Sequence, residues 1–308
     1  VTYRRQTPRR LTLVSAAPRI DGPRAVLRHV YRIGHSELVQ EVSVTAGSRV
    51  LRFDTLVSWR ETACMLRTSF PLAVQAEEAT CDIQFGSIRR PTHSNTSWDL
   101  AKDEVAAHKW VDISRRTYGA ALLNDSKYGY RVKDSVLDLN LIRSVPFSGA
   151  KIEYGPVPPG EPDPRFTDQE EHRFSYALLP HAGDHVAGGV IQAAYELNVP
   201  VERVDASAHP GPLPADFSLC EPDGRDIVVE TVKQAEEGGD LIIRLHEAAG
   251  GGRTATLHVG VPVADAHLLD LMERRTRPLA VRDGSISLEF GPYEIHTIGL
   301  TTNHDGGG

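Results

Sequence analysis

Apolar and polar residues alternate along most of this sequence, and this period of two is the feature that most limits its fold. In one clear stretch Leu137, Leu139 and Leu141 alternate with Asp138 and Asn140. Successive side chains of a β-strand point to opposite faces of a sheet, so the pattern predicts strands that each bury one face. The sequence therefore predicts an all-β chain.

The alternation begins at Arg24 and predicts antiparallel strands joined by short connections. Residues 37–44 and 50–57 are separated by a connection of hairpin length that contains Gly47. Further strands are expected at residues 65–74, 80–85, 136–141, 227–232, 241–247, 254–261, 285–290 and 293–298.

Only one stretch has clear helical spacing. Val190, Ala193, Ala194 and Leu197 fall at i, i+3, i+4 and i+7, which predicts a helix over residues 188–197. For residues 264–275 the pattern leaves open a short amphipathic helix or an extended crossover. Residues 144–170 are rich in proline, glycine and acidic residues, which predicts an exposed loop.

Prolines between residues 200 and 214 mark an expected boundary between two domains. The 308 residues are enough for a large domain at 1–198 and a smaller β-sandwich at 199–300, with a disordered tail at 301–308. The net charge of -7 and the lack of a basic run argue against nucleic acid or an anionic membrane as partner.

The cysteines and the hydropathy indicate the compartment. Cys64, Cys81 and Cys220 are far apart and form no Cys-x-x-Cys pair, which is typical of buried thiols in a reducing compartment. No apolar run reaches the roughly 18 residues that a membrane span needs. A cytoplasmic location is therefore expected.

Residues 89–130 concentrate aromatic and polar side chains to a degree that apolar packing explains poorly. They indicate either a binding site or a set of capped turns with Trp98 and Trp110 in the core. Asp99, Glu104 and Asp125 are the candidate acid and base groups. Equally, Asp99 would cap a helix or turn, Glu104 would pair with Lys102 or Lys109, and Asp125 would form a turn; we favour these structural roles for Asp99 and Glu104.

The best candidate site residues are Asn124, Asp125, Tyr128 and Tyr130. The flanking stretches are expected strands, so residues 124–127 should form the tip of a hairpin, with both tyrosine rings on one side. A turn with two such rings can line a sugar site, where rings stack on the pyranose and polar groups meet its hydroxyls.

Histidines offer little support for a metal site in this chain. The candidate ligands are His93, His108, His172, His181 and His185. Only the last two are four residues apart, in a segment that follows a proline and spans a glycine. No metal site is expected here.

Several blocks of this sequence resemble the C-terminal half of the glycoside hydrolase family 38 α-mannosidases. They are Phe-Gly at 85–86, Arg-Pro-Thr-His at 90–93, Asn-Thr-Ser-Trp-Asp at 95–99, Glu-Val at 104–105, His-Lys-Trp at 108–110, Tyr-Gly at 118–119, Ala-Leu-Leu-Asn-Asp-Ser-Lys-Tyr-Gly-Tyr at 121–130, His-Arg-Phe at 172–174 and Tyr-Ala-Leu-Leu-Pro-His at 176–181. The resemblance is weaker after residue 200.

The resemblance implies a large galactose-mutarotase-like supersandwich followed by a smaller β-sandwich. It also implies a retaining mannosidase with two catalytic carboxylates and a zinc ion bound by His and Asp in an N-terminal barrel. None of the thirteen histidines here precedes an Asp by two positions, so no catalytic residue and no cofactor are expected in this chain. Its partners would be its own catalytic domain and a mannose-containing glycan, with residues 124–130 on one wall of the site.

The chain alone should therefore be inactive, and residues 144–170 look like an insertion relative to the family. Two other readings remain open at this point. One is a free-standing carbohydrate-binding β-sandwich, and the other is a sugar mutarotase that uses a His and a Glu, which rests on fold analogy alone.

Overall fold

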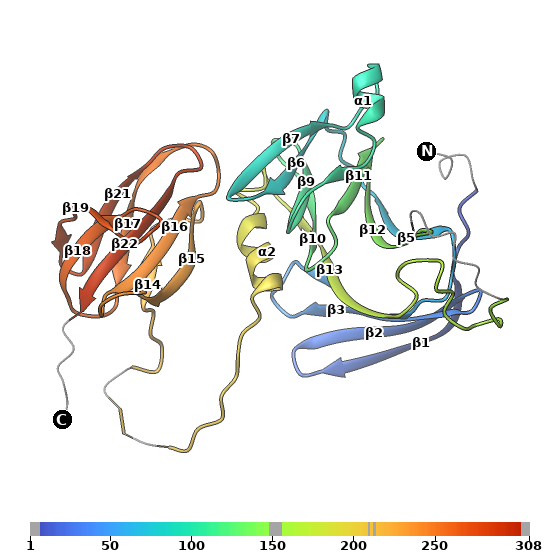
Figure 1. Ribbon diagram of the computed structural model, residues 1–308, viewed down its shortest axis with the longest axis horizontal. Helices are drawn as coiled ribbons and strands as arrows, with labels where there is room; N and C mark the ends of the chain where they lie inside the picture. Colours follow the sequence, from blue (N-terminus) through green and yellow to red (C-terminus); the bar gives the residue numbers. More distant parts are fainter. Residues whose placement is uncertain (1–6, 148–155, 209, 212–213, 303–308) are drawn as a thin grey trace. The chain divides into compact units, whose positions relative to one another are not determined.

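The computed structural model describes residues 7–147, 156–208, 210–211 and 214–302 (Figure 1). The chain is all-β, as predicted, and its antiparallel sheets form sandwich-like layers. Contacts divide it into two compact units: unit 1 holds Val1–Asp82 and Arg89–Pro200, and unit 2 holds Ile83–Ile88 and Val201–Gly308. Neither described helix is long and apolar enough to cross a bilayer.

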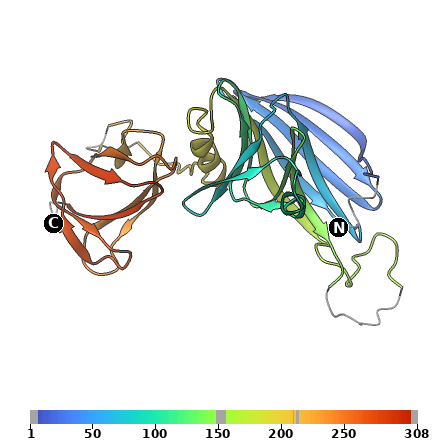
Figure 2. The same ribbon diagram turned by 90° about the horizontal axis from the view of Figure 1, so that it is seen from above.

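Unit 1 is built on a nine-stranded sheet whose order differs from the order of the chain. Strands β1–β4 form a meander at one end of the sheet (Figure 2), and β13 joins them to the other strands. In spatial order the strands are β1 (Thr12–Asp21), β2 (Arg24–Ile33), β3 (Ser36–Thr45), β4 (Leu51–Ser58), β13 (Glu171–His181), β10 (Gly119–Asn124), β9 (Trp110–Ser114), β6 (Glu78–Ile83) and β7 (Gly86–Pro91).

A four-stranded sheet packs on one face of the nine-stranded sheet. Its strands, in spatial order, are β5 (Cys64–Pro71), β12 (Val136–Ser144), β11 (Gly129–Lys133) and β8 (Val105–Ala106). The alternation predicted for β12 is observed: Leu137, Leu139 and Leu141 enter the core, while Asp138 and Asn140 occupy the alternate positions of the strand. The core of unit 1 thus lies between the two sheets.

The described residues include two short helices beside these sheets. The helix α2 (Val190–Asn198) confirms the predicted helix and contacts β9 and β10 through its buried residues Val190, Ile191 and Ala194. The helix α1 (Ser97–Ala101) has no buried residue. Trp98 is therefore 77% exposed, contrary to the expected core position, whereas Trp110 is buried as expected.

Unit 2 contains two further antiparallel sheets around its own apolar core. One consists of β14 (Cys220–Pro222), β17 (Arg253–Val259), β21 (Ser285–Phe290) and β20 (Val281–Arg282), in that order. The other consists of β15 (Ile227–Gln234), β16 (Leu241–Glu247), β22 (Ile295–Thr302), β18 (Val263–Leu269) and β19 (Arg275–Pro278). Residues 264–275, left open between a short helix and an extended crossover, form neither. They run along β18, through a turn and into β19, which pairs with β18 as a hairpin.

Three further outcomes concern loops and chain ends. Thr301 and Thr302 belong to β22, so the tail predicted at 301–308 begins too early, and its remainder lies outside the described residues. The expected loop at 144–170 contains one isolated bridge between Pro146 and Phe166 in its described part; residues 148–155 lie outside it. Strand β1 was not predicted.

Candidate functional site

The segment Asp125–Tyr128 connects two different sheets of unit 1. Strand β10 pairs with β9 and β13 in the nine-stranded sheet, whereas β11 pairs with β12 and β8 in the four-stranded sheet. The predicted hairpin tip is therefore wrong. Periodicity identifies strands but does not say which strands pair, and a crossing between layers has the same local pattern as a hairpin.

Asn124 lies at the start of this connection and holds its two ends together. Its side chain is fully buried and donates hydrogen bonds to the carbonyl oxygen of His108 at 2.7 Å and to the hydroxyl of Tyr130 at 2.5 Å. Its Oδ1 atom accepts a hydrogen bond from the backbone N–H of Lys127. Asn124 therefore shapes the connection from inside.

Tyr130 is also fully buried, and its ring belongs to the core cluster of unit 1. Burial raises the pKa of its hydroxyl above the ordinary range, so the group stays protonated. The two rings predicted to share one side are separated, because Tyr128 is 54% exposed just before β11 begins. Of the four candidate residues, Asn124 and Tyr130 are thus placed to position the connection and not to contact a ligand.

In this connection Ser126 and Tyr128 are exposed, and Asp125 is half-buried. One carboxylate oxygen of Asp125 accepts the backbone N–H of Ser175 at 2.8 Å, and the other accepts the hydroxyl of Ser126 at 2.9 Å. The Tyr128 ring lies 5.8 Å from the ring of His108 in an edge-on arrangement. Asp125 thus has the turn role that was expected for it. The same segment also exposes the Tyr128 ring, as a binding site requires.

Lys127 adds a positive charge to the same surface. Its ammonium group lies 4.6 Å from the centre of the Phe174 ring, in the geometry of a cation–π contact. Burial lowers the pKa of Lys127, while the nearby carboxylates of Asp168 and Asp125 act in the opposite direction. An ammonium group, a carboxylate and a phenol are thus presented together by four consecutive residues.

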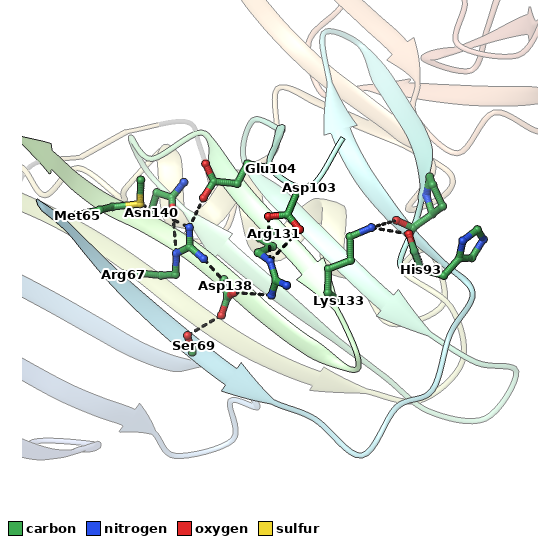
Figure 3. A network of polar contacts seen from close by, with 11 residues as sticks. Met65, Arg67, Ser69, His93, Asp103, Glu104, Arg131, Lys133, Asp138 and Asn140 are labelled. Carbon is green, nitrogen blue, oxygen red and sulfur yellow. Dashed lines mark hydrogen bonds and ion pairs between the residues drawn. The ribbon is translucent and has the colours of Figure 1, made fainter. Parts of the chain in front are cut away.

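A second polar cluster occupies the outward side of the four-stranded sheet (Figure 3), and we call it the outer polar face. It comprises Arg67, Ser69, Asp103, Glu104, Arg131, Lys133, Asp138 and Asn140. Asp138 is its centre: its carboxylate accepts hydrogen bonds from Ser69 at 2.5 Å, from Arg67 at 3.3 Å and from Arg131 at 3.4 Å.

Ion pairs also join this face to the segment before β8, which carries Asp103 and Glu104. Arg131 bonds both oxygens of Asp103 at 3.2 Å, and Arg67 pairs with Glu104. The expected pairing of Glu104 with Lys102 or Lys109 is therefore wrong, and Lys109 instead pairs with Asp82 at 3.4 Å. The alternation in β12 predicts that Asp138 and Asn140 share a polar face. It does not predict that Arg67 of β5 and Arg131 of β11 lie beside them, because this depends on which strands pair.

The capping role expected for Asp99 is confirmed. Thr96 is the N-cap of α1, and its hydroxyl accepts the backbone N–H of Asp99, while the Asp99 carboxylate accepts the backbone N–H of Thr96. The hydrogen bond from the Thr96 side chain lowers the pKa of Asp99. Asp99 thus stays ionised as a cap.

The histidines have separate structural partners. His181 Nε2 lies 2.7 Å from the Asp112 carboxylate in a fully buried pair. The His185 ring stacks on Trp110 with centroids 5.1 Å apart, and burial lowers its pKa. Among the described residues, no group of three or more His, Cys, Asp and Glu side chains could hold a metal ion.

Comparisons with known proteins agree on one family. Residues 3–165 match the model of the glycosyl hydrolases family 38 C-terminal domain, and residues 226–298 match that of the family 38 C-terminal beta sandwich domain. A human protein named alpha-mannosidase 2C1 is 42% identical over 273 residues, which are 86% of this chain and 24% of that relative.

More distant relatives give the same result. Alpha-mannosidase G of Dictyostelium discoideum is 31% identical over 280 residues, which are 88% of this chain and 24% of that relative. The crystal structure of an alpha-mannosidase from Enterococcus faecalis V583 shares the fold with a TM-score of 0.75 at 16% identity, over 94% of this chain and 35% of that one. The chain thus belongs to glycosyl hydrolase family 38, and it corresponds to the C-terminal domains of that family.

Proposed function

We propose that this chain is the non-catalytic C-terminal part of a zinc-dependent retaining α-mannosidase. The observation that carries the proposal is the match of both units to family 38 C-terminal models, while the chain spans only 24% of the length of its human relative. The remaining part would supply the nucleophile, the acid and base group, and the zinc ligands. The sequence of this chain has no His-x-Asp pair that could supply the last of these.

We further propose that Asp125, Lys127 and Tyr128 form one wall of the sugar site. A pyranose has an apolar face that stacks on an aromatic ring and hydroxyl groups that bond to charged side chains. The exposed ring of Tyr128 and the half-buried Lys127 offer both within one short segment. Asn124 and Tyr130 would hold that segment in place.

The test uses the intact polypeptide that contains this chain and an aryl α-mannoside as substrate. Zinc-dependent turnover by the intact polypeptide, and none by the 308-residue chain, is the expected result. In the intact polypeptide, Tyr128→Ala should raise KM about tenfold, equivalent to about 1.4 kcal/mol of lost binding. The exposed Tyr118, just before the opposite end of β10, gives the matched control: Tyr118→Ala should leave KM unchanged.

Two outcomes would contradict parts of this proposal separately. Intact polypeptide without α-mannosidase turnover would overturn the function. If Tyr128→Ala changes neither turnover nor the melting temperature, residues 125–128 do not belong to the sugar site. That result would not contradict the proposed mannosidase function.

We propose a cytoplasmic location for the protein. Cys64, Cys81 and Cys220 are all free thiols, and burial raises the pKa of each of them, which makes them poorly reactive. Free thiols of this kind are typical of reducing compartments. Localisation of a tagged intact protein by fluorescence microscopy would test this.

A second candidate is a free-standing carbohydrate-binding module, which the outer polar face favours because hydrogen bonds among its own side chains hold its charged groups in fixed positions. This function requires the isolated 308-residue chain to bind a mannose oligosaccharide. Calorimetric titration of the isolated chain with such an oligosaccharide distinguishes the two candidates, because the mannosidase proposal expects no binding without the catalytic part.

A further inference from the structure

The core-facing side of the nine-stranded sheet extends beyond the apolar core of unit 1. On strand β2, Tyr31 and Ile33 pack against the core cluster. Leu27 lies on the same face of the same strand, because it is an even number of residues away, yet it is 37% exposed. The apolar face of β2 therefore continues past the region that the described residues cover.

Neighbouring strands extend this uncovered apolar area. Ala25 pairs with Ile20 on one side and with Val44 on the other, so these side chains share its face. Ile20 is 78% exposed and Val44 is 41% exposed. Together they border a groove of about 670 Å³ whose lining is Pro18, Arg19, Ile20, Ala25, Val26, Leu27, Val42, Ser43, Val44 and Leu51; we call it the β1–β4 groove.

The β1–β4 groove is continuous with the core and is not a separate surface feature. Val42, in its lining, pairs with Phe53, whose ring stacks on Tyr176 at 4.9 Å in the core. A contiguous exposed apolar area next to a core marks a surface that another part of a protein covers. Burying the exposed side chains there would remove apolar surface from water and so stabilise the assembly.

The shape of β1 favours a partner that packs on the face of the sheet over one that adds a strand to its edge. Pro18 lies on this edge strand, and a bulge interrupts its pairing between Leu13 and Ser15. A proline and a bulge on an edge strand both hinder pairing with a further strand. Edge-to-edge association of two copies is therefore disfavoured.

We propose that the part of the intact polypeptide that precedes β1 packs into the β1–β4 groove. This inference rests on the proposed function, in which the catalytic part belongs to the same polypeptide. The human relative is about four times as long as the matched region, so ample chain exists to cover the groove. A segment of the same polypeptide also has a higher effective concentration at this groove than a separate molecule, which favours it over a second copy.

Cysteine accessibility tests the proposal without relying on activity. Val44→Cys and Ile20→Cys, placed in the 308-residue chain and in the intact polypeptide, are labelled with a maleimide and compared with the parent, which has three native thiols. Arg28→Cys is the matched control, because Arg28 is exposed on the opposite face of β2. We expect labelling of the first two to be at least tenfold slower in the intact polypeptide, with no change for Arg28→Cys.

Either of two results would overturn the proposal. Equal labelling of Val44→Cys in both proteins would show that the groove stays open. Protection in the 308-residue chain that increases with its concentration would identify a second copy as the occupant. Protection in an intact polypeptide without mannosidase turnover would support the docking surface while contradicting the proposed function.

Discussion

Residues of the connection between β10 and β11 divide into those that hold it and those that it presents. Asn124 and Tyr130 are fully buried and bonded to each other, whereas Tyr128 is 54% exposed. The sequence motif contains all three and does not distinguish them. Their separation results from the strand boundary at Gly129, after which alternation points Tyr130 into the core.

Replacement of Asn124 should be costly for stability. We expect Asn124→Ala to lower the free energy of unfolding by about 2–3 kcal/mol, because it removes the donor to the buried Tyr130 hydroxyl and the part-buried bonds to His108 and Lys127. Urea denaturation measures this, and the exposed Ser126→Ala variant should stay within about 0.5 kcal/mol of the parent. A value for Asn124→Ala as small as that of the control would show that the hydrogen bonds contribute little.

His185 should make the protein less stable in mild acid. Burial lowers its pKa in the folded state below the ordinary value of 6.5. The unfolded chain therefore binds a proton more readily than the folded chain as pH falls through about 6.5, so stability is lost in that direction. His185→Phe keeps a ring against Trp110 and should flatten the dependence of the melting temperature on pH between about 6.5 and 5. An unchanged slope would exclude His185 as its source.

The sequence predicts strands where the alternation of apolar and polar residues is long, but it does not predict which strands pair with each other. The strand expected at 241–247 is observed with those bounds, as β16 (Leu241–Glu247), and the helix expected at 188–197 is α2. Strand β1 was missed because its sequence has no clean alternation and all ten of its residues are exposed. The wrong hairpin and the wrong partner of Glu104 share one cause: local pattern does not contain the long-range pairing that brings β8 and β5 into one sheet.

The ion pair between Arg67 and Glu104 links β5 to the segment before β8 across the outer polar face. We expect a double-mutant cycle with Arg67→Met and Glu104→Gln to give a coupling of about 1 kcal/mol, since both side chains are largely shielded, at 20% and 28% exposure. The ion pair of Arg203 and Asp205 is a matched control with side chains 84% and 83% exposed. Its coupling should be close to zero. Equal couplings for the two pairs would contradict the structural role.

At the scale of the whole molecule, the two apolar cores are separate. One cluster lies in unit 1 and the other in unit 2, without shared residues. We expect calorimetry to resolve two unfolding transitions. Glu247 is buried in unit 2, and its carboxylate accepts the backbone N–H groups of Ala249 and Gly250 at 2.8 Å and of Tyr293 at 2.9 Å.

Glu247→Ala should therefore lower only one of the two transitions, by about 3 kcal/mol in unfolding free energy. Asn124→Ala should lower only the other. The exposed Glu221→Ala variant is the control for unit 2 and should change neither. A single transition that both variants lower together would show that the units unfold as one.

The position of β13 in the nine-stranded sheet has a consequence for how the protein is made. Strands β1–β4 are neighbours in sequence as well as in the sheet, so they can pair as they leave the ribosome. Strands β10, β9, β6 and β7 form the other half of the sheet, and among the described strands β13 alone joins the halves. Its pairing of Glu171 with Ser58 closes a loop of more than a hundred residues, which is a slow step. The sheet is complete only after residue 181, the end of β13, has been synthesised. A fragment that ends at residue 165, where the first family match ends, lacks β13. We expect its two half-sheets to expose unpaired edge strands and to aggregate.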